Sequence, residues 1–376
     1  MRKVFQSILL SLVITSCNIK ESNLKIRETN IILSANKSFS YDVKNRLNVS
    51  YLENRNNEFI FFMDKKTSLI EKYKINKNKL EQISKVSIRD LFHLKNSVPE
   101  SISVLSEDSL LIASRDNNSI CITDYSFKNN KFYSLDYNGY VIHSFSQPIY
   151  FHKNLLYMLK TPPINIFSSR TNLSEYYKNS PGIIFDVNKQ KVYTENISKY
   201  PENINESNTY QVFNPYTCID GIGNYVFTYG PLNEIYVYNV DGKLIGTHSP
   251  ESKYYKEPEP FPTTSLGDDK FTYKYIITNG TYKDIIYDRY RNVYFRVYML
   301  PSEDQFGSIL PSPAEKEWSL MMLSSDFSII SEQKMNNKYD PNTIIVTKNG
   351  ILISENRFMS ESYSSKRIDY RLFEIK

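Results

Sequence analysis

The sequence predicts an all-β protein, a six-bladed β-propeller with insertions between its strands. The first observation is composition, because the chain has 31 Tyr and 21 Phe but only 11 Gly and one Trp, and aromatic and β-branched residues suit a pleated sheet. The second is a succession of short apolar segments separated by turns rich in Asn, Asp, Gly, Pro and Ser, which is typical of all-β folds. The third is that these segments recur in six sets of roughly 60 residues, a spacing that fits blades of about 40–50 residues with insertions.

The first 16 residues are predicted to be an export signal and not part of the fold. Arg2 and Lys3 form a positive start, and the apolar run at 4–14 is too short to span a bilayer, which takes about 20 apolar residues. The run ends in ITSC at 14–17, which resembles the bacterial lipobox. That resemblance implies cleavage before Cys17 and a lipid on its sulfur, and two or more acyl chains make such an anchor stable. The alternative is a plain signal peptide that meets a cysteine by chance.

The mature chain is predicted to have two parts, a lipidated tether with the first strand at 17–37 and the propeller domain at 38–376. No later stretch approaches 18 consecutive apolar residues, so the lipid is the expected membrane attachment. Removing Arg2 and Lys3 with the signal lowers the formal charge from +5 to +3. This near-neutral charge, spread over scattered lysines, gives no support to nucleic-acid binding.

The six strand sets share one plan. Their leading apolar segments lie at 58–65, 109–115, 154–160, 224–231, 284–300 and 349–357. In most sets a turn follows, then a strand that ends in a Tyr- or Asp-containing element such as ITDY, IFDV or VYNV. A four-stranded sheet cannot bury both faces alone, so neighbouring blades must cover them, and ring closure protects the sheet edges. The sets are not clean repeats, and five or seven blades, or a stack of β-sandwich domains, remain as alternatives.

Two insertions and the two chain ends complete the predicted fold. Short helical turns are expected at Thr171 to Asn179 and at Ser312 to Trp318. Terminal strands of propellers often complete one blade together. The last segment, RLFEIK at 371–376, is therefore a candidate partner for the first strand.

The lipobox, the strand cadence, the length and the passage VYNVDGKLIGTHSPESKYY at 237–255 together resemble Bacteroidetes lipoproteins of the domain-of-unknown-function 4221 (DUF4221) family. The resemblance covers nearly the whole mature chain and implies a six-bladed, propeller-like fold and an envelope location. It implies no activity and transfers no catalytic residue.

The sequence contains no local motif for a metal, a cofactor or a nucleophile. Its four histidines, His93, His143, His152 and His248, have no metal-ligand spacing, and no GxSxG elbow, P-loop or GxGxxG is present. No cofactor is therefore predicted. The acidic clusters lack the spacing of a calcium loop and are interpreted as solvated turns.

Apart from Cys17, the sequence contains two cysteines. Cys121 and Cys218 lie in strand-like apolar contexts. Two buried free thiols are expected, with one disulfide as the alternative.

One loop is a candidate ligand-binding segment. Residues 252–269 (SKYYKEPEPFPTTSLGDD) interrupt the strand pattern, and their prolines favour an extended loop. Tyr254, Tyr255 and Phe261 on this loop supply rigid contact area for a sugar or peptide. The alternative, which we favour, is that the loop packs back onto its own blade.

Two functions fit these observations. The first is an envelope lipoprotein, in the outer membrane because Asn18 and not Asp follows Cys17, that binds or scaffolds a protein, peptide or glycan. The second is an envelope enzyme, a glycan lyase or hydrolase, whose acid and base come from different blades and leave no local motif. The absence of a catalytic motif favours the first, and whether the protein faces the periplasm or the cell surface stays open.

Overall fold

The computed structural model describes sixteen segments of the chain. They are 26–35, 48–54, 57–64, 68–76, 79–88, 99–106, 109–114, 119–126, 128–135, 141–143, 148–164, 170–207, 209–210, 214–302, 316–355 and 368–375. Cys17 and the predicted signal lie outside these segments, as does His93. Among the described residues, no helix is long and apolar enough to cross a membrane.

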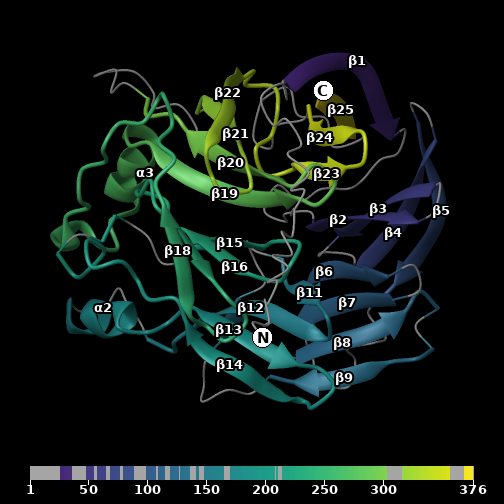
Figure 1. The fold of residues 1–376 in the computed structure, drawn as a ribbon, viewed down its shortest axis with the longest axis horizontal. Coiled ribbons are helices and arrows are strands. Elements are labelled where there is room, and N and C mark those ends of the chain that lie inside the picture. Colours follow the sequence, from purple (N-terminus) through teal and green to yellow (C-terminus); the bar gives the residue numbers. More distant parts are fainter. Residues whose placement is uncertain are drawn as a thin grey trace, which may run out of the picture.

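Six small antiparallel sheets surround one axis, as the sequence predicted (Figure 1). In chain order the first three blades are β2(Asn48–Asn54), β3(Asn57–Asp64), β4(Leu69–Asn76), β5(Lys79–Ser87); β6(Pro99–Ser106), β7(Ser109–Ser114), β8(Ser119–Asp124), β9(Lys131–Ser134); and β10(Val141–His143), β11(Tyr150–His152), β12(Leu155–Thr161), β13(Gly182–Asp186), β14(Lys191–Ile197). The last three are β15(Tyr216–Ile219), β16(Tyr225–Thr228), β17(Ile235–Tyr238), β18(Leu244–His248); β19(Thr281–Asp288), β20(Val293–Met299), β21(Trp318–Leu323), β22(Ile329–Met335); and β23(Ile345–Thr347), β24(Gly350–Ser354), β25(Ile368–Ile375) with β1(Ile26–Ala35).

The two ends of the chain close the ring. The N-terminal strand β1 pairs antiparallel with the C-terminal strand β25, from Ile26 opposite Ile375 to Ala35 opposite Ile368. The first strand of the chain thus becomes the outer strand of the sixth blade, the closure predicted from the sequence. A single parallel residue pair, Ser34 with Lys79, then joins this blade to the first.

The core is divided among the joints between blades. Six clusters of buried apolar residues each join a pair of neighbouring blades. On β3 the alternation is clear, because Ile60 and Phe62 pack toward the sixth blade whereas Phe61 and Met63 pack toward the second. A propeller strand is covered on both faces, which explains why the leading segment of each set is apolar throughout instead of alternating.

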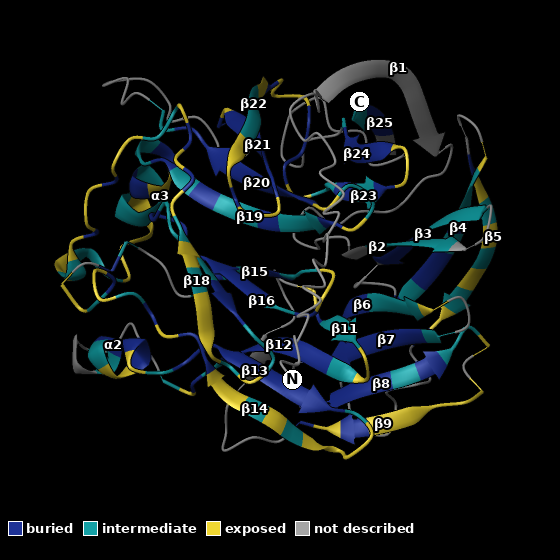
Figure 2. Ribbon diagram, in the orientation of Figure 1, coloured by how far each residue is buried: buried dark blue, intermediate teal, exposed yellow. Residues whose placement is uncertain are grey.

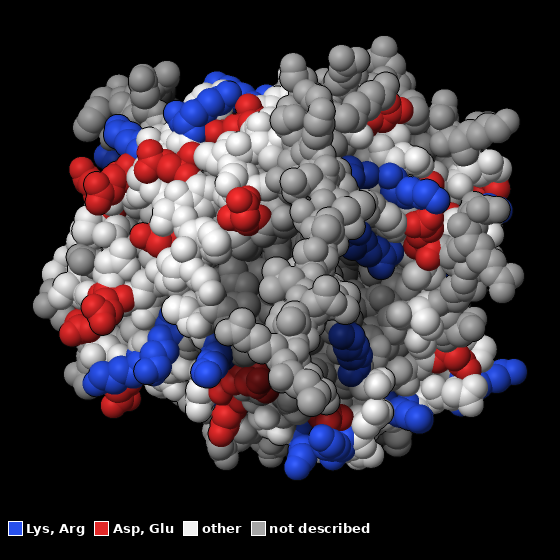
Figure 3. Space-filling model, in the orientation of Figure 1, with Lys and Arg blue, Asp and Glu red and all other residues white. Residues whose placement is uncertain are grey.

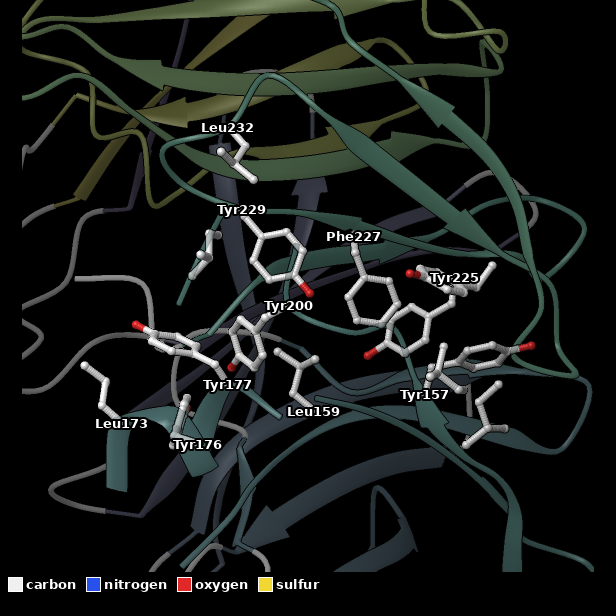
Figure 4. Packing of buried hydrophobic residues seen from close by; sticks show 14 residues of the cluster. Tyr157, Leu159, Leu173, Tyr176, Tyr177, Tyr200, Tyr225, Phe227, Tyr229 and Leu232 are labelled. Atoms are coloured by element: carbon white, nitrogen blue, oxygen red, sulfur yellow. The ribbon is translucent and has the colours of Figure 1, made fainter. Parts of the chain in front are cut away.

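The joint between blades 3 and 4 is dominated by tyrosine (Figure 4). Tyr157 meets Tyr225 edge-to-face with ring centroids 5.4 Å apart, and Tyr177 meets Tyr200 in the same way at 5.1 Å. Edge-to-face contacts of this kind add about 0.5–1.5 kcal/mol per pair beyond area burial. The many tyrosines of the sequence are therefore largely core residues here, and their hydroxyls reach backbone or side-chain partners.

The Asp- or Asn-containing strand ends found in the sequence have one structural role. In blades 2 to 5 they start the hairpin turn between the third and fourth strands, where the side-chain oxygen accepts backbone N–H groups of the turn, as local Asx turns do. The residues are Asp124, Asp186, Asn239 and Asp326.

Helices occur only in the long connections among the described residues. α2(Arg170–Tyr177) lies where Thr171 to Asn179 was predicted to be helical. The second expected helix is only partly covered, since residues 312–315 lie outside the described segments and Trp318 begins β21. The helix α3(Asp269–Thr278) was not predicted from the sequence. It follows the short 3-10 turn η3(Thr263–Ser265).

Candidate functional site

The innermost strands of blades 3, 4 and 5 bring three polar side chains together beside the central axis. These strands are β11, β15 and β19, which surround the middle of the ring (Figure 1). They carry Tyr150, Cys218 and Asp284 respectively. Tyr150 bonds to the carbonyl oxygen of Thr217, the residue before Cys218, and both Tyr150 and Cys218 pack in the cluster between blades 4 and 5. The negative charge of Asp284 raises the pKa of both groups. We call this set the axial cluster.

Asp284 is the chemically unusual member of the axial cluster. It lies beside a register shift in the pairing of β19 with β20, and its Oδ1 accepts the N–H of Ile285 at 3.0 Å. Among the described residues this is its one hydrogen bond, and no second carboxyl group bonds to it. Its side chain keeps partial exposure, yet burial raises its pKa to about 7, against a smaller lowering by the charge of Lys283. Near neutral pH this carboxyl is therefore poised between its two protonation states.

The other two members of the cluster stay neutral. Tyr150 donates its hydroxyl proton to the carbonyl oxygen of Thr217 at 2.6 Å, which ties blade 3 to blade 4. Burial, and then the charge of neighbouring groups, holds its pKa well above the usual range. Burial likewise raises the pKa of the Cys218 thiol, and the charges of Asp284 and Asp220 raise it further. A thiol acts as a nucleophile only as thiolate, so Cys218 is not activated.

The turn after β15 closes one side of this region. The Asp220 carboxylate accepts the backbone N–H groups of residues 222–224 and the side-chain amide of Asn224. Gly223, at φ +97°, lies against the His152 ring, where a Cβ would approach Cδ2 to 2.9 Å. Burial lowers the pKa of His152, and its Nε2 is buried with no partner among the described residues. The imidazole is therefore neutral at physiological pH.

The loop predicted as a ligand-binding segment packs largely on its own molecule. Phe261 is fully buried and meets Phe271 and Tyr275 edge-to-face. Tyr255 stacks on Tyr282 with centroids 6.1 Å apart, and Tyr254 lies beneath the ammonium group of Lys253. These contacts agree with the alternative that we favoured, although they do not test whether Tyr254 and Tyr255 contact a ligand.

The start of this loop is tied to the next blade. The hydroxyl of Ser252 donates to Oε1 of Glu332 at 2.5 Å, and the N–H of Lys253 donates to Oε2 of the same residue at 2.8 Å. Glu332 belongs to β22. The loop is thus held between blades 4 and 5.

The remaining residues of interest from the sequence are placed as follows. Cys121 and Cys218 are both buried free thiols in different blades, as expected. His248 packs against Phe327 with ring centroids 4.6 Å apart, and only the backbone of His143 is described. Among the described residues no group of three or more His, Cys, Asp or Glu is placed to hold a metal ion.

Charged side chains of both signs are interspersed on the face seen in Figure 3, and neither sign dominates its described atoms. A nucleic-acid interface would show a basic stripe. This face has none among its described residues.

Sequence reasoning missed the axial cluster because its members come from three blades and have no common motif. One signal was available. The segment KDII at 283–286 places a carboxylate directly before the apolar pair Ile285 and Ile286 within a strand, and a carboxyl group with a strongly shifted pKa points to a functional role.

Comparison with known proteins finds the same fold in solved structures. A crystal structure of a DUF4221 family member from Bacteroides vulgatus ATCC 8482 is similar with a TM-score of 0.72 and 17% sequence identity, over 95% of this chain and 99% of that chain. A candidate exported protein from Bacteroides fragilis NCTC 9343 is similar with a TM-score of 0.50 and 11% identity, over 95% of this chain and 96% of that chain. No family model and no curated protein matches the sequence. At these identities the likeness shows a shared propeller fold, and it confirms at that level the resemblance noted from the sequence.

Proposed function

We propose that this protein is a lipid-anchored envelope protein whose propeller binds a protein, peptide or glycan partner, with the axial cluster as a contact site. The observation that carries the proposal is the chemistry of that cluster. The thiol and the phenol are held protonated, and Asp284 has no second carboxylate hydrogen-bonded to it among the described residues. Such a set donates and accepts hydrogen bonds but contains no activated nucleophile.

The rigidity of the ring supports a binding role. Closure of β1 on β25 completes a ring in which each blade packs against a neighbour on both faces, so polar groups beside the axis are pre-organised. A pre-organised site loses less entropy on binding than a flexible one.

The binding proposal is tested by capture from native envelopes. The full lipidated chain and its Asp284→Asn variant are used as bait, and Asp241→Asn, which changes an exposed carboxylate on a turn, is the matched control. We expect a partner to be retained by the wild type and by Asp241→Asn and to be reduced by at least about fivefold with Asp284→Asn, equivalent to roughly 1 kcal/mol. Equal retention by all three proteins would remove the axial cluster from the site.

The lipid anchor and the outer-membrane location are proposed from the sequence alone. Replacing Cys17 with Ser is expected to abolish incorporation of a radiolabelled fatty acid and to release the protein into the soluble fraction. Separating inner and outer membranes of cells that express the wild type then tests the location. Membrane retention of the Cys17→Ser variant would refute the anchor.

An enzymatic function has one observation in its favour. A carboxyl group with a pKa of about 7 is in the range where a general acid or base operates at neutral pH. A glycan lyase or hydrolase would then lose activity with Asp284→Asn, whereas a binding protein releases no product. Incubating envelope glycans with both proteins and measuring new reducing ends or unsaturated products separates the two functions.

A further inference from the structure

Where the structure describes them, the turns from first to second strand and from third to fourth strand lie on one side of the ring. The turn after β8 is joined to the end of the innermost strand β6 by the bond from the Tyr125 hydroxyl to the Ser106 carbonyl oxygen at 3.1 Å. The turn after β23 is joined to the first blade by the ion pair of Lys348 with Glu53 at 3.2 Å. In a propeller, first-to-second and third-to-fourth strand turns share one side, and the connections between blades share the other. We call these the hairpin face and the insertion face.

The N-terminal strand starts at the hairpin face. Ile26 pairs with Ile375, and Glu374 pairs with Gly350, which directly follows the turn at 348–349. Eight residues lie between Cys17 and Ile26, and the nine Cα–Cα steps that join the two span at most about 30 Å when extended. A lipid on Cys17 would therefore hold the hairpin face toward the bilayer and within that distance of it.

Exposed apolar side chains gather near the same face. Ile222, at the tip of the turn after β15, is 77% exposed. Others stand at or next to the starts of outer strands, directly after hairpin turns, and these strands appear as exposed bands at the rim in Figure 2. They are Phe132, Tyr193, Leu244, Ile245 and Ile329. On the insertion face Ile276 of α3 is the corresponding residue among those described, and Ile83 lies in the middle of the outer strand β5, on neither face. More exposed apolar side chains therefore lie near the hairpin face than near the insertion face.

Charge is distributed unequally between the two faces as well. The exposed basic residues on hairpin turns or the adjoining strand starts are Lys128, Lys131, Lys153, Lys189, Lys191, Lys243, Arg289 and Lys348, against the exposed acids Asp241 and Asp326. The exposed acids on the described connections of the insertion face are Glu175, Glu202, Glu206, Glu251, Glu257, Glu259, Asp268, Asp269 and Glu317, against the bases Lys178, Lys199, Lys253, Lys256, Lys270 and Lys338. The hairpin face is therefore basic and the insertion face mildly acidic.

We propose that the hairpin face is a membrane-contact surface that rests on anionic phospholipid headgroups and turns the insertion face outward. The proposal rests on the proposed lipid anchor and adds to it an orientation and a second, protein-borne contact. Basic residues are attracted to an anionic membrane surface, and exposed aliphatic and aromatic side chains enter the interfacial layer. The insertions α2 and α3 would then face a partner and not the lipid.

The test measures the proximity of each face to lipid. A single fluorophore is placed through Ile222→Cys on the hairpin face or through Ile276→Cys on the insertion face, both exposed isoleucines. The two native thiols outside the signal region are buried and unlabelled. The full lipidated proteins are bound to vesicles of phosphatidylcholine and phosphatidylglycerol, with and without brominated acyl chains that quench nearby fluorophores. We expect quenching at residue 222 to exceed that at 276 by at least about threefold.

The outcomes separate this inference from the anchor. Failure of the wild type to float with vesicles would overturn the lipid anchor and the orientation with it. Flotation with equal quenching at the two positions, or stronger quenching at 276, would overturn the orientation alone. A signal at 222 that changes with protein concentration in the absence of vesicles would identify a second copy, and not lipid, as the occupant and would also overturn the proposal.

A charge-reversal variant tests the headgroup contact. Lys153→Glu, Lys243→Glu and Arg289→Glu are combined on the hairpin face, and Lys178→Glu, Lys199→Glu and Lys270→Glu form the matched set on the insertion face. Both sets should still float through the lipid, but only the first should lower quenching at residue 222, by about twofold or more. Equal effects of the two sets would show that net charge, and not this face, governs the contact.

Discussion

Blade 5 carries two buried ionisable side chains on neighbouring strands, and their surroundings differ in kind. Arg296 on β20 extends to blade 4, where its guanidinium donates to the carbonyl oxygens of Asn233, Leu232 and Pro250. It also lies over the Tyr282 ring at 3.5 Å from the centroid. Asp284 on β19 has a single backbone N–H and no cation bonded to it among the described residues. Arg296 is fully buried and its two terminal nitrogens receive several carbonyl partners from the protein, whereas Asp284 keeps partial exposure and receives one backbone N–H.

This difference separates a structural charge from a candidate functional one. Burial lowers the pKa of Arg296 only to about 10, so it stays charged and holds together the turn after β16 and the start of the loop at 250. Burial moves the pKa of Asp284 to about 7, so its charge state changes under physiological conditions. A largely desolvated carboxylate with only one hydrogen bond lowers stability when it is charged. Its presence beside the axis is the reason to assign it to ligand binding.

Replacing Arg296 is expected to have the largest effect on stability. Arg296→Met keeps much of the side-chain volume but leaves several buried carbonyl oxygens without donors, each costing about 1–3 kcal/mol. We expect a loss of about 3–5 kcal/mol in the free energy of unfolding, measured by chemical denaturation. Arg296→Lys should recover only part of this loss, because the compact ammonium group of lysine cannot reach all the acceptors that the planar, forked guanidinium reaches. A loss below about 1 kcal/mol for Arg296→Met would contradict the structural role.

Neutralising Asp284 should have the opposite sign. The folded-state pKa of about 7 exceeds the ordinary value of 3.8, so the folded protein holds the proton more tightly than the unfolded chain. Stability should therefore fall as pH rises from about 4 to about 7 and then level off. Asp284→Asn should be more stable than the wild type at pH 8 by roughly 2 kcal/mol, and the two should be equally stable near pH 4. This value is about half the free energy that corresponds to the full pKa shift, because the group is partly screened by solvent.

The control for this experiment is Asp326 on a turn of the same blade. Hydrogen bonds from the Ser324 side chain and the Ser328 backbone lower its pKa, so its charge contributes stability above the ordinary pKa, and this contribution is lost as pH falls. Asp326→Asn should therefore be slightly less stable than the wild type at pH 8. A gain in stability for both variants would indicate a general effect of net charge and would contradict the assignment of Asp284 as an unpartnered buried group.

The sequence predicted the strands that recur in each blade and the pairing of the first and last strands of the chain. Apolar runs such as FIFFMD at 59–64 predicted strands covered on both faces from their hydrophobic pattern. RLFEIK was a candidate partner for the first strand because the terminal strands of propellers often complete one blade together. The helix α3 was missed because its start, Asp268, was interpreted as a solvated turn, whereas its carboxylate accepts the N–H of Phe271 as an N-cap. A cap cannot be distinguished from a turn by residue type alone.

The axial cluster and the Arg296 contacts were not predictable for a different reason. Arg296 lies 46 to 68 positions from its acceptors in the chain, and Tyr150 lies 67 positions from Thr217. Such contacts depend on which blades are neighbours and on how each strand is rotated. Periodicity fixes the face of a strand but not the partner that a polar side chain meets beside the axis.

The smallest expected effect concerns thiol reactivity, and it tests the neighbourhood of Asp284 directly. The charge of Asp284 contributes to the raised pKa of Cys218, whereas burial alone raises the pKa of Cys121 to about 12. Asp284→Asn should therefore lower the pKa of Cys218 and accelerate its alkylation roughly threefold at pH 8.5. Cys121 in blade 2 is the internal control, and both rates are followed by mass spectrometry under native conditions. Equal acceleration of the two cysteines would mean that the substitution opens the whole fold, and no acceleration of Cys218 would separate Asp284 from the thiol. Selective acceleration would place the carboxylate beside Cys218 and support the contrast with Arg296, whose charge the protein itself satisfies.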